Sequence, residues 1–156
     1  MKSFAVYKTK FGFFRIEYEN NKISSILKMN AAPVDFGIKT ALTEKVFSEL
    51  TEYFNSKRKT FDIPLELHGT DFQKKVWAEL CKIPYGETRS YKEIAQAIGN
   101  EKACRAVGMA NNKNPVVIIV PCHRVIGSNG SLTGYACGLE MKALLLQLEK
   151  GNSSLV

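Results

Sequence analysis

Apolar and polar residues alternate along the first part of the chain. Between residues 3 and 28 the alternation is interrupted by Asn20-Asn21, in the way that a turn interrupts a sheet. A two-residue period predicts strands, so we expect an antiparallel β-meander. Over residues 40–56 apolar side chains recur at helical spacing, which predicts one helix packed on the sheet. We expect residues 1–66 to form a small α/β lobe that supports the rest of the protein.

Helical spacing dominates the second part of the chain, residues 67–156. A capping box pairs a Ser or Thr with a Gln or Glu three residues later, and it marks the start of a helix. Thr70 with Gln73 and Ser90 with Glu93 both fit this pattern. The chain therefore combines a β-rich first lobe with a mostly helical second lobe, which predicts an α/β fold of the α+β kind.

Two short helices are predicted on either side of a tight turn at Gly99. The first follows Ser90, and the second covers about residues 101–110. Such a pair resembles a helix-turn-helix, which places its second helix on DNA, although similar pairs occur in domains that never contact DNA. A final helix is predicted over residues 138–149, with four leucines facing inward: Leu139, Leu144, Leu145 and Leu148.

A continuous run of β-branched residues occupies positions 116–120. Such a run is typical of a strand that is buried on both faces. It leads into Pro121 and Cys122, so we expect a short active-site strand that ends at a reactive thiol. A thiol attacks only as the thiolate, and with an ordinary pKa of about 8.5 it needs a base at neutral pH.

His123 is the nearest base in the sequence. Adjacent side chains of an extended segment point to opposite faces, so a hydrogen bond between Cys122 and His123 requires a turn or a bridging water. Pro121 restricts the backbone and favours such a bend. Taken alone, the Cys-His pair favours a small buried cysteine beside a histidine that has no chemical role.

Composition narrows the class of protein. The 156 residues are 45% hydrophobic and 24% charged, which is typical of one compact domain or a small pair of domains. No apolar run is long enough to span a membrane and the start lacks a secretory signal, so we expect a cytoplasmic protein without a membrane partner. The four cysteines are then expected to be reduced. The absence of C-x-x-C spacing and the presence of only two histidines argue against a structural zinc site.

Part of the net charge of +7 is concentrated in one segment. Between Lys102 and Leu139 the chain carries no Asp or Glu, while it carries the basic residues Lys102, Arg105, Lys113 and Arg124. A local positive field of this kind attracts a phosphate backbone. A basic surface that serves only solubility is the alternative.

The segment Pro121-Cys122-His123-Arg124-Val125 resembles the active-site signature of the O6-alkylguanine-DNA alkyltransferase family. Flanking motifs match the family in order and spacing: Tyr91, Arg105-Ala106-Val107-Gly108, Asn114-Pro115 and Tyr135-x-x-Gly138-Leu139. The resemblance covers residues 70–150 strongly, and the first 66 residues fit the family's more variable N-terminal lobe. It implies transfer of an alkyl group from O6 of guanine in double-stranded DNA, and also from O4 of thymine, to the cysteine.

The resemblance also implies a role for each residue of the reaction site. Cys122 is the acceptor, His123 is its base through a water molecule, and Glu149 orients the imidazole ring. Tyr91 donates a hydrogen bond toward the substrate base. Asn114 connects the turn after the second helix of the pair to the active-site strand. Without the resemblance, Glu149 is an ordinary surface carboxylate on an amphipathic helix.

For DNA, the resemblance implies that Arg105 enters the minor groove and fills the place of a flipped-out base. Further DNA contacts are expected from Ser90, Tyr91, Lys102, Ala106, Lys113 and Arg124. The flipped guanine is expected to lie against Tyr91, Val125, Tyr135, Ala136 and Cys137. The thioether product has no good leaving group, so we expect one transfer per molecule, by a monomer without metal or other cofactor.

Two positions depart from many relatives, and three other functions stay open. Cys137 brings a second thiol near the pocket, and Met109 follows Gly108 where some relatives have glycine. The other functions are lesion binding without reaction, hydrolysis at a cysteine, and transcription control. The presence of Cys122 disfavours the first, and the lack of an oxyanion-hole pattern disfavours the second. The third is disfavoured because the second helix of the pair carries few base-reading side chains.

Overall fold

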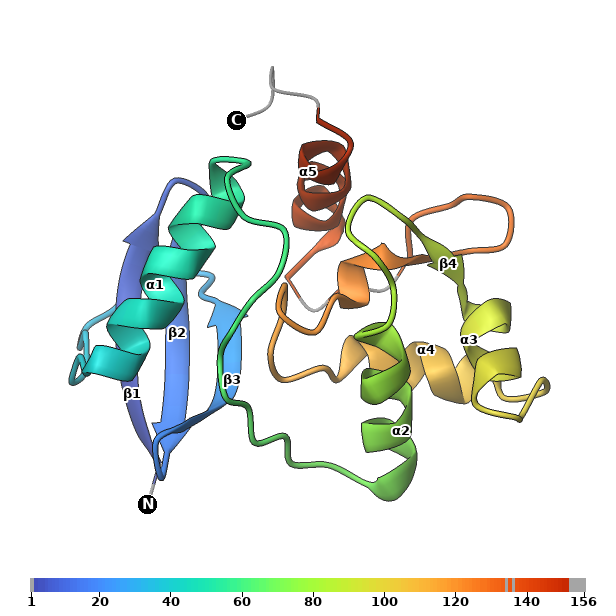
Figure 1. Cartoon of the computed structure of the whole chain (residues 1–156), viewed down its shortest axis with the longest axis horizontal. Helices are drawn as coiled ribbons and strands as arrows, with labels where there is room; N and C mark the ends of the chain where they lie inside the picture. Colours follow the sequence, from blue (N-terminus) through green and yellow to red (C-terminus); the bar gives the residue numbers. More distant parts are fainter. Residues whose placement is uncertain (1, 134, 136, 152–156) are drawn as a thin grey trace.

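A computed structural model describes residues 2–133, 135 and 137–151 of the chain. The described residues form an N-terminal lobe with a sheet and a helix, and a C-terminal lobe built mainly of helices (Figure 1). Within these ranges, none of the helices combines the length and the apolar character that a membrane span requires.

The N-terminal sheet is antiparallel, in the order β1 (Ser3–Thr9), β2 (Gly12–Glu19) and β3 (Lys22–Lys28). This order confirms the predicted β-meander. Asn20 and Asn21 form the turn between β2 and β3, with φ angles of 51° and 60°. Asparagine tolerates this left-handed region better than most residues, which suits the pair to a two-residue hairpin.

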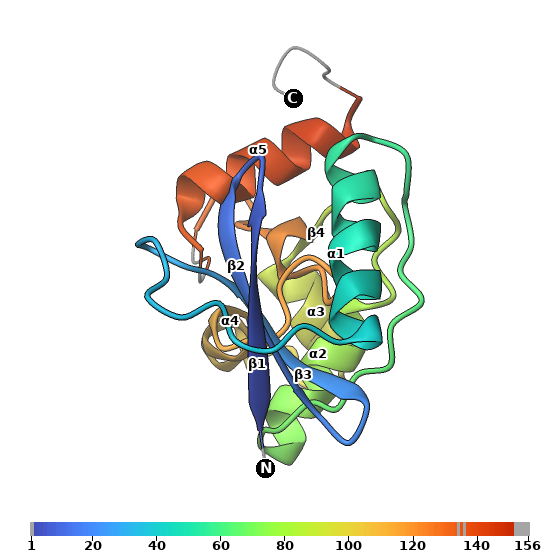
Figure 2. The ribbon, with the colours of Figure 1, turned by 90° about the vertical axis from the view of Figure 1, so that its left-hand side faces the viewer.

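Helix α1 (Ala41–Phe54) packs against this sheet (Figure 2). It begins at a capping box in which Thr40 and Thr43 each bind the backbone N–H of the other. The ring of Phe54 meets the ring of Phe14 in β2 at 5.9 Å between centroids. The other large buried side chains of the helix are Val46, Leu50 and Tyr53.

The C-terminal lobe begins with three helices that pack on one another: α2 (Asp71–Leu80), α3 (Tyr91–Ala97) and α4 (Cys104–Asn112). Helices α2 and α3 start at the two predicted capping boxes, at Thr70 and Ser90. The chain passes from α3 to α4 through Gly99, whose φ of +80° is a conformation that glycine adopts without strain.

Two short strands and a last helix complete the lobe. Strands β4 (Arg89–Ser90) and β5 (Val125–Ile126) pair in parallel. Strand β5 directly follows the segment that contains Cys122. Helix α5 (Leu139–Glu149) follows the predicted boundaries, but its first leucine does not face inward. Leu145 and Leu148 are buried, whereas Leu139, the first residue of the helix, is 49% exposed.

One hydrophobic core extends through both lobes. At their boundary, the N–H of Ile26 in β3 donates to the carbonyl of Pro115 at 2.8 Å, and the carbonyl of Ile26 accepts from Val117 at 3.1 Å. The chain that leads to Cys122 is therefore attached to an edge of the N-terminal sheet.

The predicted strand over residues 116–120 is wrong. The run is largely buried, as expected, but it folds back on itself: the N–H of Val120 donates to the carbonyl of Val116 at 3.1 Å. At the bend, Ile118 has a φ of 75°, a conformation that β-branched residues rarely adopt. A continuous apolar run indicates that a segment is buried, but it does not indicate the path of the backbone. In this segment the buried backbone forms a turn and not a strand.

Candidate active site

Cys122 lies at the start of a single 3₁₀ turn, η1 (Cys122–Arg124), and is 1% exposed. Its N–H donates to the carbonyl of Val120 at 2.8 Å, and its carbonyl accepts from the side-chain amide of Asn111 at 3.3 Å. Successive side chains in a 3₁₀ turn are rotated by about a third of a turn. Cys122 and His123 therefore do not point to opposite faces, as they would in a strand.

The surroundings of Cys122 keep its thiol protonated at rest. Burial raises the pKa of Cys122 to about 12, although the Asn114 side chain and the positive charge of Lys142 act in the opposite direction. A thiol with this pKa is almost wholly protonated at neutral pH. Nucleophilic chemistry at this sulfur must therefore begin with transfer of its proton to a base.

His123 and Glu149 form a buried hydrogen-bonded pair. Nε2 of His123 lies 2.7 Å from Oε2 of Glu149, and both side chains are at most 1% exposed. Burial lowers the pKa of His123, with Glu149 acting against this change, so the ring is neutral at neutral pH. A neutral ring beside a carboxylate carries its proton on Nε2 and leaves Nδ1 as an acceptor. Nδ1 is buried and has no hydrogen-bond partner among the described residues.

Glu149 gathers donors from several parts of the chain. Besides His123, its carboxylate accepts from the hydroxyl of Tyr53 at 2.5 Å, from the N–H of Gly86 at 3.2 Å, and from the guanidinium of Arg124 at 2.8 and 2.9 Å. Burial alone would raise the pKa of Glu149, but the hydrogen bonds from His123 and Arg124 lower it to about 2. The carboxylate is ionised at neutral pH, and its orientation is fixed.

Arg124 is turned inward, so the prediction that it contacts DNA is wrong. Its side chain is 8% exposed, and besides both oxygens of Glu149 it binds the carbonyl of Ile83 at 2.7 Å. A guanidinium that is held by a buried carboxylate is not available to a phosphate. The sequence shows the positive charge of Arg124 but not its direction, which is set by the need of a buried carboxylate for a cationic partner.

Asn114 spans the two arms of the turn over residues 116–120. Its side-chain carbonyl accepts from the N–H of Val116 at 3.0 Å, and its amide donates to the carbonyl of Val120 at 2.8 Å. The residue is 2% exposed. The side chain thus links the end of α4 to the segment that immediately precedes the thiol.

Lys142 is a buried base that the sequence patterns did not single out. Its Nζ donates to the carbonyl oxygens of Val125 at 2.5 Å and Thr133 at 2.7 Å. Burial lowers the pKa of Lys142 to about 8, and the nearby Cys122 acts in the opposite direction. One signal was present in the sequence: Lys142 precedes Glu149 by seven residues, or about two helical turns, so the two share a face of α5.

Tyr91 is the first residue of α3, and its hydroxyl faces the segment before α5. It donates to the carbonyl of Thr133 at 2.8 Å and accepts from the hydroxyl of Thr133 at 3.2 Å. Of the other predicted pocket residues, Val125 and Tyr135 are buried. The hydroxyl of Tyr135 has no partner among the described residues, and Ala136 lies outside them.

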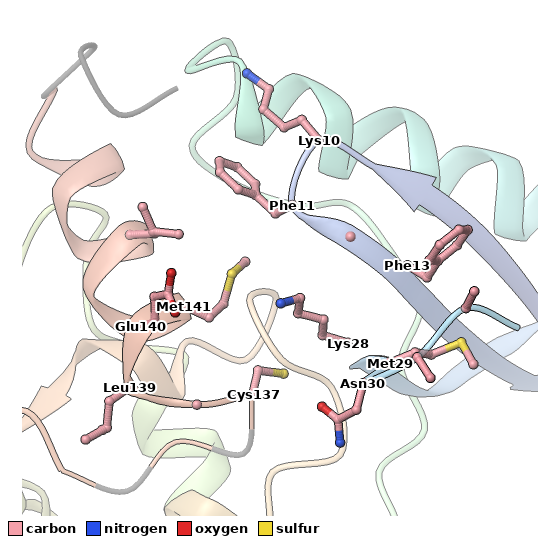
Figure 3. Close-up of a pocket in the computed structure, with 15 residues that line it drawn as sticks. Lys10, Phe11, Phe13, Lys28, Met29, Asn30, Cys137, Leu139, Glu140 and Met141 are labelled. Atoms are coloured by element: carbon pink, nitrogen blue, oxygen red, sulfur yellow. The ribbon is translucent and has the colours of Figure 1, made fainter.

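Cys137 borders a cavity of about 610 Å³ between the N-terminal sheet and the start of α5 (Figure 3). Lys28 and Phe13 line it from the sheet, and Met141 lines it from the helix. Burial raises the pKa of Cys137, so this side chain is also a thiol at neutral pH. Burial is the main cause of the raised pKa of Cys122, and the negative charge that Cys137 would carry as a thiolate raises it further. The second thiol therefore lies near the first.

Four of the predicted DNA contacts are exposed, on and beside α4: Lys102, Arg105, Ala106 and Lys113. Arg105 forms no ion pair within the described ranges, and it borders an open hollow of about 440 Å³ whose other walls include Tyr91 and Thr133. Ser90, the N-cap residue of α3, is half-buried. The predicted interface residues other than Arg124 therefore remain accessible at least in part.

The described residues thus combine a buried thiol, a histidine–carboxylate pair and an exposed arginine on the neighbouring helix α4. Residues 71–151 match the family model described as "6-O-methylguanine DNA methyltransferase, DNA binding domain", and residues 3–67 match "6-O-methylguanine DNA methyltransferase, ribonuclease-like domain". The chain belongs to the 6-O-methylguanine DNA methyltransferase family.

Individual relatives resemble the chain over different lengths. The methylated-DNA–protein-cysteine methyltransferase of Methanosarcina barkeri is 62% identical over 104 residues, which cover 67% of this chain and 66% of that protein, just under two thirds. The constitutive methylated-DNA–protein-cysteine methyltransferase of Bacillus subtilis is 44% identical over 159 residues, which cover 96% of both. The crystal structure of Mycobacterium tuberculosis OGT in complex with DNA has a TM-score of 0.87 and 41% identity, covering 95% of this chain and 92% of that one.

Proposed function

We propose that this protein repairs alkylated DNA by transferring the alkyl group from O6 of guanine to Sγ of Cys122. The observation that carries the proposal is the buried thiol beside a neutral histidine, which is itself bound to an ionised carboxylate. Relatives named as methylated-DNA–protein-cysteine methyltransferases support the choice of substrate and acceptor. Lesion binding without reaction is disfavoured, because the acceptor cysteine is present.

In the proposed reaction the thiol proton passes through a water molecule to Nδ1 of His123. The thiolate then attacks the saturated carbon, and the carbon–oxygen bond breaks as the sulfur–carbon bond forms. The departing guanine takes up a proton, so a thiol and an O6-alkylguanine become a thioether and a guanine. Glu149 stabilises the imidazolium that forms along the way, and Lys142 with Asn114 stabilises the thiolate.

Tyr91 is the proposed donor toward the guanine. Its hydroxyl is bound to Thr133 in the free protein, at the rim of the hollow that it shares with Arg105. Exchange of this hydrogen bond for one to the base would stabilise the leaving group as negative charge develops on it. Val125, Tyr135, Ala136 and Cys137 complete the proposed guanine pocket.

Helix α4 is the proposed DNA-binding element. O6 of guanine is inaccessible inside a duplex, so the base must be flipped out, and we expect Arg105, which is exposed on α4, to enter the minor groove and fill the gap. Lys102, Ala106, Lys113 and Ser90 are the proposed backbone contacts. The DNA complex of Mycobacterium tuberculosis OGT supports DNA as the partner. We propose that one monomer acts on one lesion, and that O4-alkylthymine is a second substrate.

The proposed product has one further consequence. A thioether is not displaced by water or by another thiol under ordinary conditions, so each molecule reacts once. The acceptor must also remain a free thiol until it meets a lesion, which favours the reducing environment of the cytoplasm.

The test is intact mass spectrometry of the protein after incubation with duplex DNA that contains O6-methylguanine. The expected result is the addition of one methyl group, on the peptide that contains Cys122, and no addition to Cys122→Ser. Cys81→Ser is the matched control, because it removes an exposed thiol outside the proposed pocket, and it should gain the methyl group normally. A label on Cys137 in the wild type, or several lesions repaired per molecule, would contradict the proposal.

A further inference from the structure

Tyr53 connects the N-terminal lobe directly to the reaction site. It lies at the end of α1, is fully buried, and donates from its hydroxyl to Oε2 of Glu149 at 2.5 Å. The same hydroxyl lies 3.5 Å from Nε2 of His123. Oε2 is therefore shared between a phenol from one lobe and an imidazole from the other.

Packing alone does not require the hydroxyl of Tyr53. Its ring is held by aromatic neighbours, with centroids 5.8 Å from Phe54, 5.5 Å from Phe61 and 6.1 Å from Tyr85. A phenylalanine would fill the same space, and a buried hydroxyl costs free energy unless it has a partner. The bond to Glu149 is what accounts for a tyrosine at this position.

We propose that Tyr53 is a positioning residue, which holds the Glu149 carboxylate in the orientation in which Oε2 faces His123. Arg124 binds both carboxylate oxygens from one side, while Tyr53 and His123 approach the same oxygen. The inference rests on the proposed function of His123 as the base. It extends the role of the N-terminal lobe from support to the positioning of a side chain in the reaction site.

Electrostatics give the direction of the effect. Burial and the adjacent Glu149 raise the pKa of Tyr53 well above its ordinary value, so the phenol stays a neutral donor. Its hydrogen bond draws negative charge from Oε2 and is one of the influences that lower the pKa of Glu149, after those of His123 and Arg124. Without the hydroxyl, more negative charge on Oε2 faces His123, and the pKa of His123 should rise.

The other charged and titratable groups around the pair stay in place in such a variant. Arg124 and Lys142 both lower the pKa of His123. Burial is the main cause that raises the pKa values of Tyr85 and Tyr135, and the charge of Glu149 raises both further. Both tyrosines therefore lie near the pair. A change in the titration of His123 in the variant would therefore report the lost hydroxyl.

The first test is a histidine titration of Tyr53→Phe by NMR. The chain has only two histidines, and the other one, His68, is exposed and serves as an internal reference. We expect the pKa of His123 to rise by about one unit in the variant. Tyr85→Phe is the matched control, because its hydroxyl makes no hydrogen bond within the described ranges, and it should leave the titration of His123 as in the wild type.

The second test is the rate of reaction with free O6-benzylguanine as a function of pH, which needs no DNA. A base whose pKa rises is protonated over a wider range, so Tyr53→Phe should lose rate toward acidic pH and lose much less at pH 8.5. Rescue at alkaline pH distinguishes this from a purely structural loss.

Three outcomes would overturn the inference: an unchanged His123 titration, the same shift in Tyr85→Phe, or a rate loss that is uniform across pH. Near-UV circular dichroism establishes that the variant is folded. If the wild type failed to take up an alkyl group, the proposed function would fail. The titration of His123 would still decide whether Tyr53 acts on the pair.

Discussion

The thiol of Cys122 is a poor nucleophile in the resting protein because its burial opposes negative charge. The same burial favours attack once the proton has left, because a thiolate that is largely shielded from water needs little further desolvation. Asn114 and Lys142 provide the polar surroundings that the charged form requires. In the proposed reaction, proton transfer to His123 is therefore the step that the residues around the sulfur control.

The raised pKa of Cys122 predicts a specific dependence of stability on pH. The folded thiol has a pKa of about 12 against an ordinary 9.0, so in the unfolded chain it ionises first. Its contribution is fully present below pH 9 and is lost as the pH rises toward 12. Between pH 7 and pH 10 the free energy of unfolding of the wild type should fall by about 1.4 kcal/mol more than that of Cys122→Ser. Urea unfolding measures this difference, and parallel pH dependences would contradict it.

At the scale of elements, helix α4 and the reaction site are joined by short side-chain links. Asn111, near the end of α4, binds the carbonyl of Cys122, and Asn114 binds the carbonyl of Val120. The helix proposed to bind DNA is thus attached within a few residues to the backbone that carries the thiol. Displacement of α4 on DNA would be transmitted to the sulfur through these amides.

Asn114→Ala should weaken this attachment. The change leaves the buried N–H of Val116 without its partner and removes one of the two donors to the carbonyl of Val120, so we expect a loss of about 1–3 kcal/mol in the free energy of unfolding. The rate with free O6-benzylguanine should also fall, because the turn that positions the thiol loosens. Urea unfolding and the rate measure the two effects. Asn112→Ala, an exposed change in the same segment, is the control and should alter neither.

Arg105→Ala should slow the repair of a lesion in duplex DNA without slowing the alkyl transfer itself. Arg105 is exposed on α4 and has no ion pair within the described ranges, so its removal should leave the reaction with free O6-benzylguanine unchanged. Repair of O6-methylguanine in duplex DNA should slow by tenfold or more, because unstacking of a base costs about a few kcal/mol that the arginine helps to offset.

Rates on the two substrates, measured side by side, provide the comparison for Arg105→Ala. Lys57→Ala removes an exposed positive charge just beyond the end of α1 and serves as the control. Equal losses on both substrates would exclude a role of Arg105 in base flipping.

Local patterns predicted the elements whose signals are local. The alternation in residues 3–28, the capping boxes at Thr70 and Ser90, and the turn at Gly99 all depend on neighbours within a few residues. The run over residues 116–120 was misjudged because an apolar stretch reports burial without reporting the path of the backbone.

The parts of the site that were missed depend on distant partners. Tyr53 binds a carboxylate 96 residues further along the chain, and Arg124 faces inward because of that same carboxylate at Glu149. No local pattern encodes such pairings. The resemblance to a family supplied Glu149 itself, since a carboxylate near the end of an amphipathic helix is otherwise expected on the surface.

At the scale of the whole molecule, the two lobes share a single core and a single carboxylate. The sheet is bonded to the segment before the thiol through Ile26, and α1 reaches Glu149 through Tyr53. The reaction site is therefore sensitive to how the lobes pack on each other, although most of its residues come from the C-terminal lobe.

Alkylation should lower the stability of the whole protein. Cys122 belongs to the closely packed core, and an added methyl group must be accommodated by shifts of its neighbours, at a cost of about 1–3 kcal/mol. Urea unfolding at pH 7, before and after complete reaction with methylated DNA and removal of that DNA, measures the change. Cys122→Ser carried through the same treatment should show none. A methylated protein as stable as the free one would mean that the site already has room for the product.

The burial of Cys122 also decides what else can consume it. If each molecule reacts once, as proposed, it is wasted whenever a reactive metabolite or a thiol-modifying reagent caps its sulfur. Cys81 is exposed and Cys122 is enclosed, so general electrophiles reach the sulfur of Cys81 first. The fold thereby keeps the acceptor in reserve for a reaction partner that is presented to it in the correct geometry.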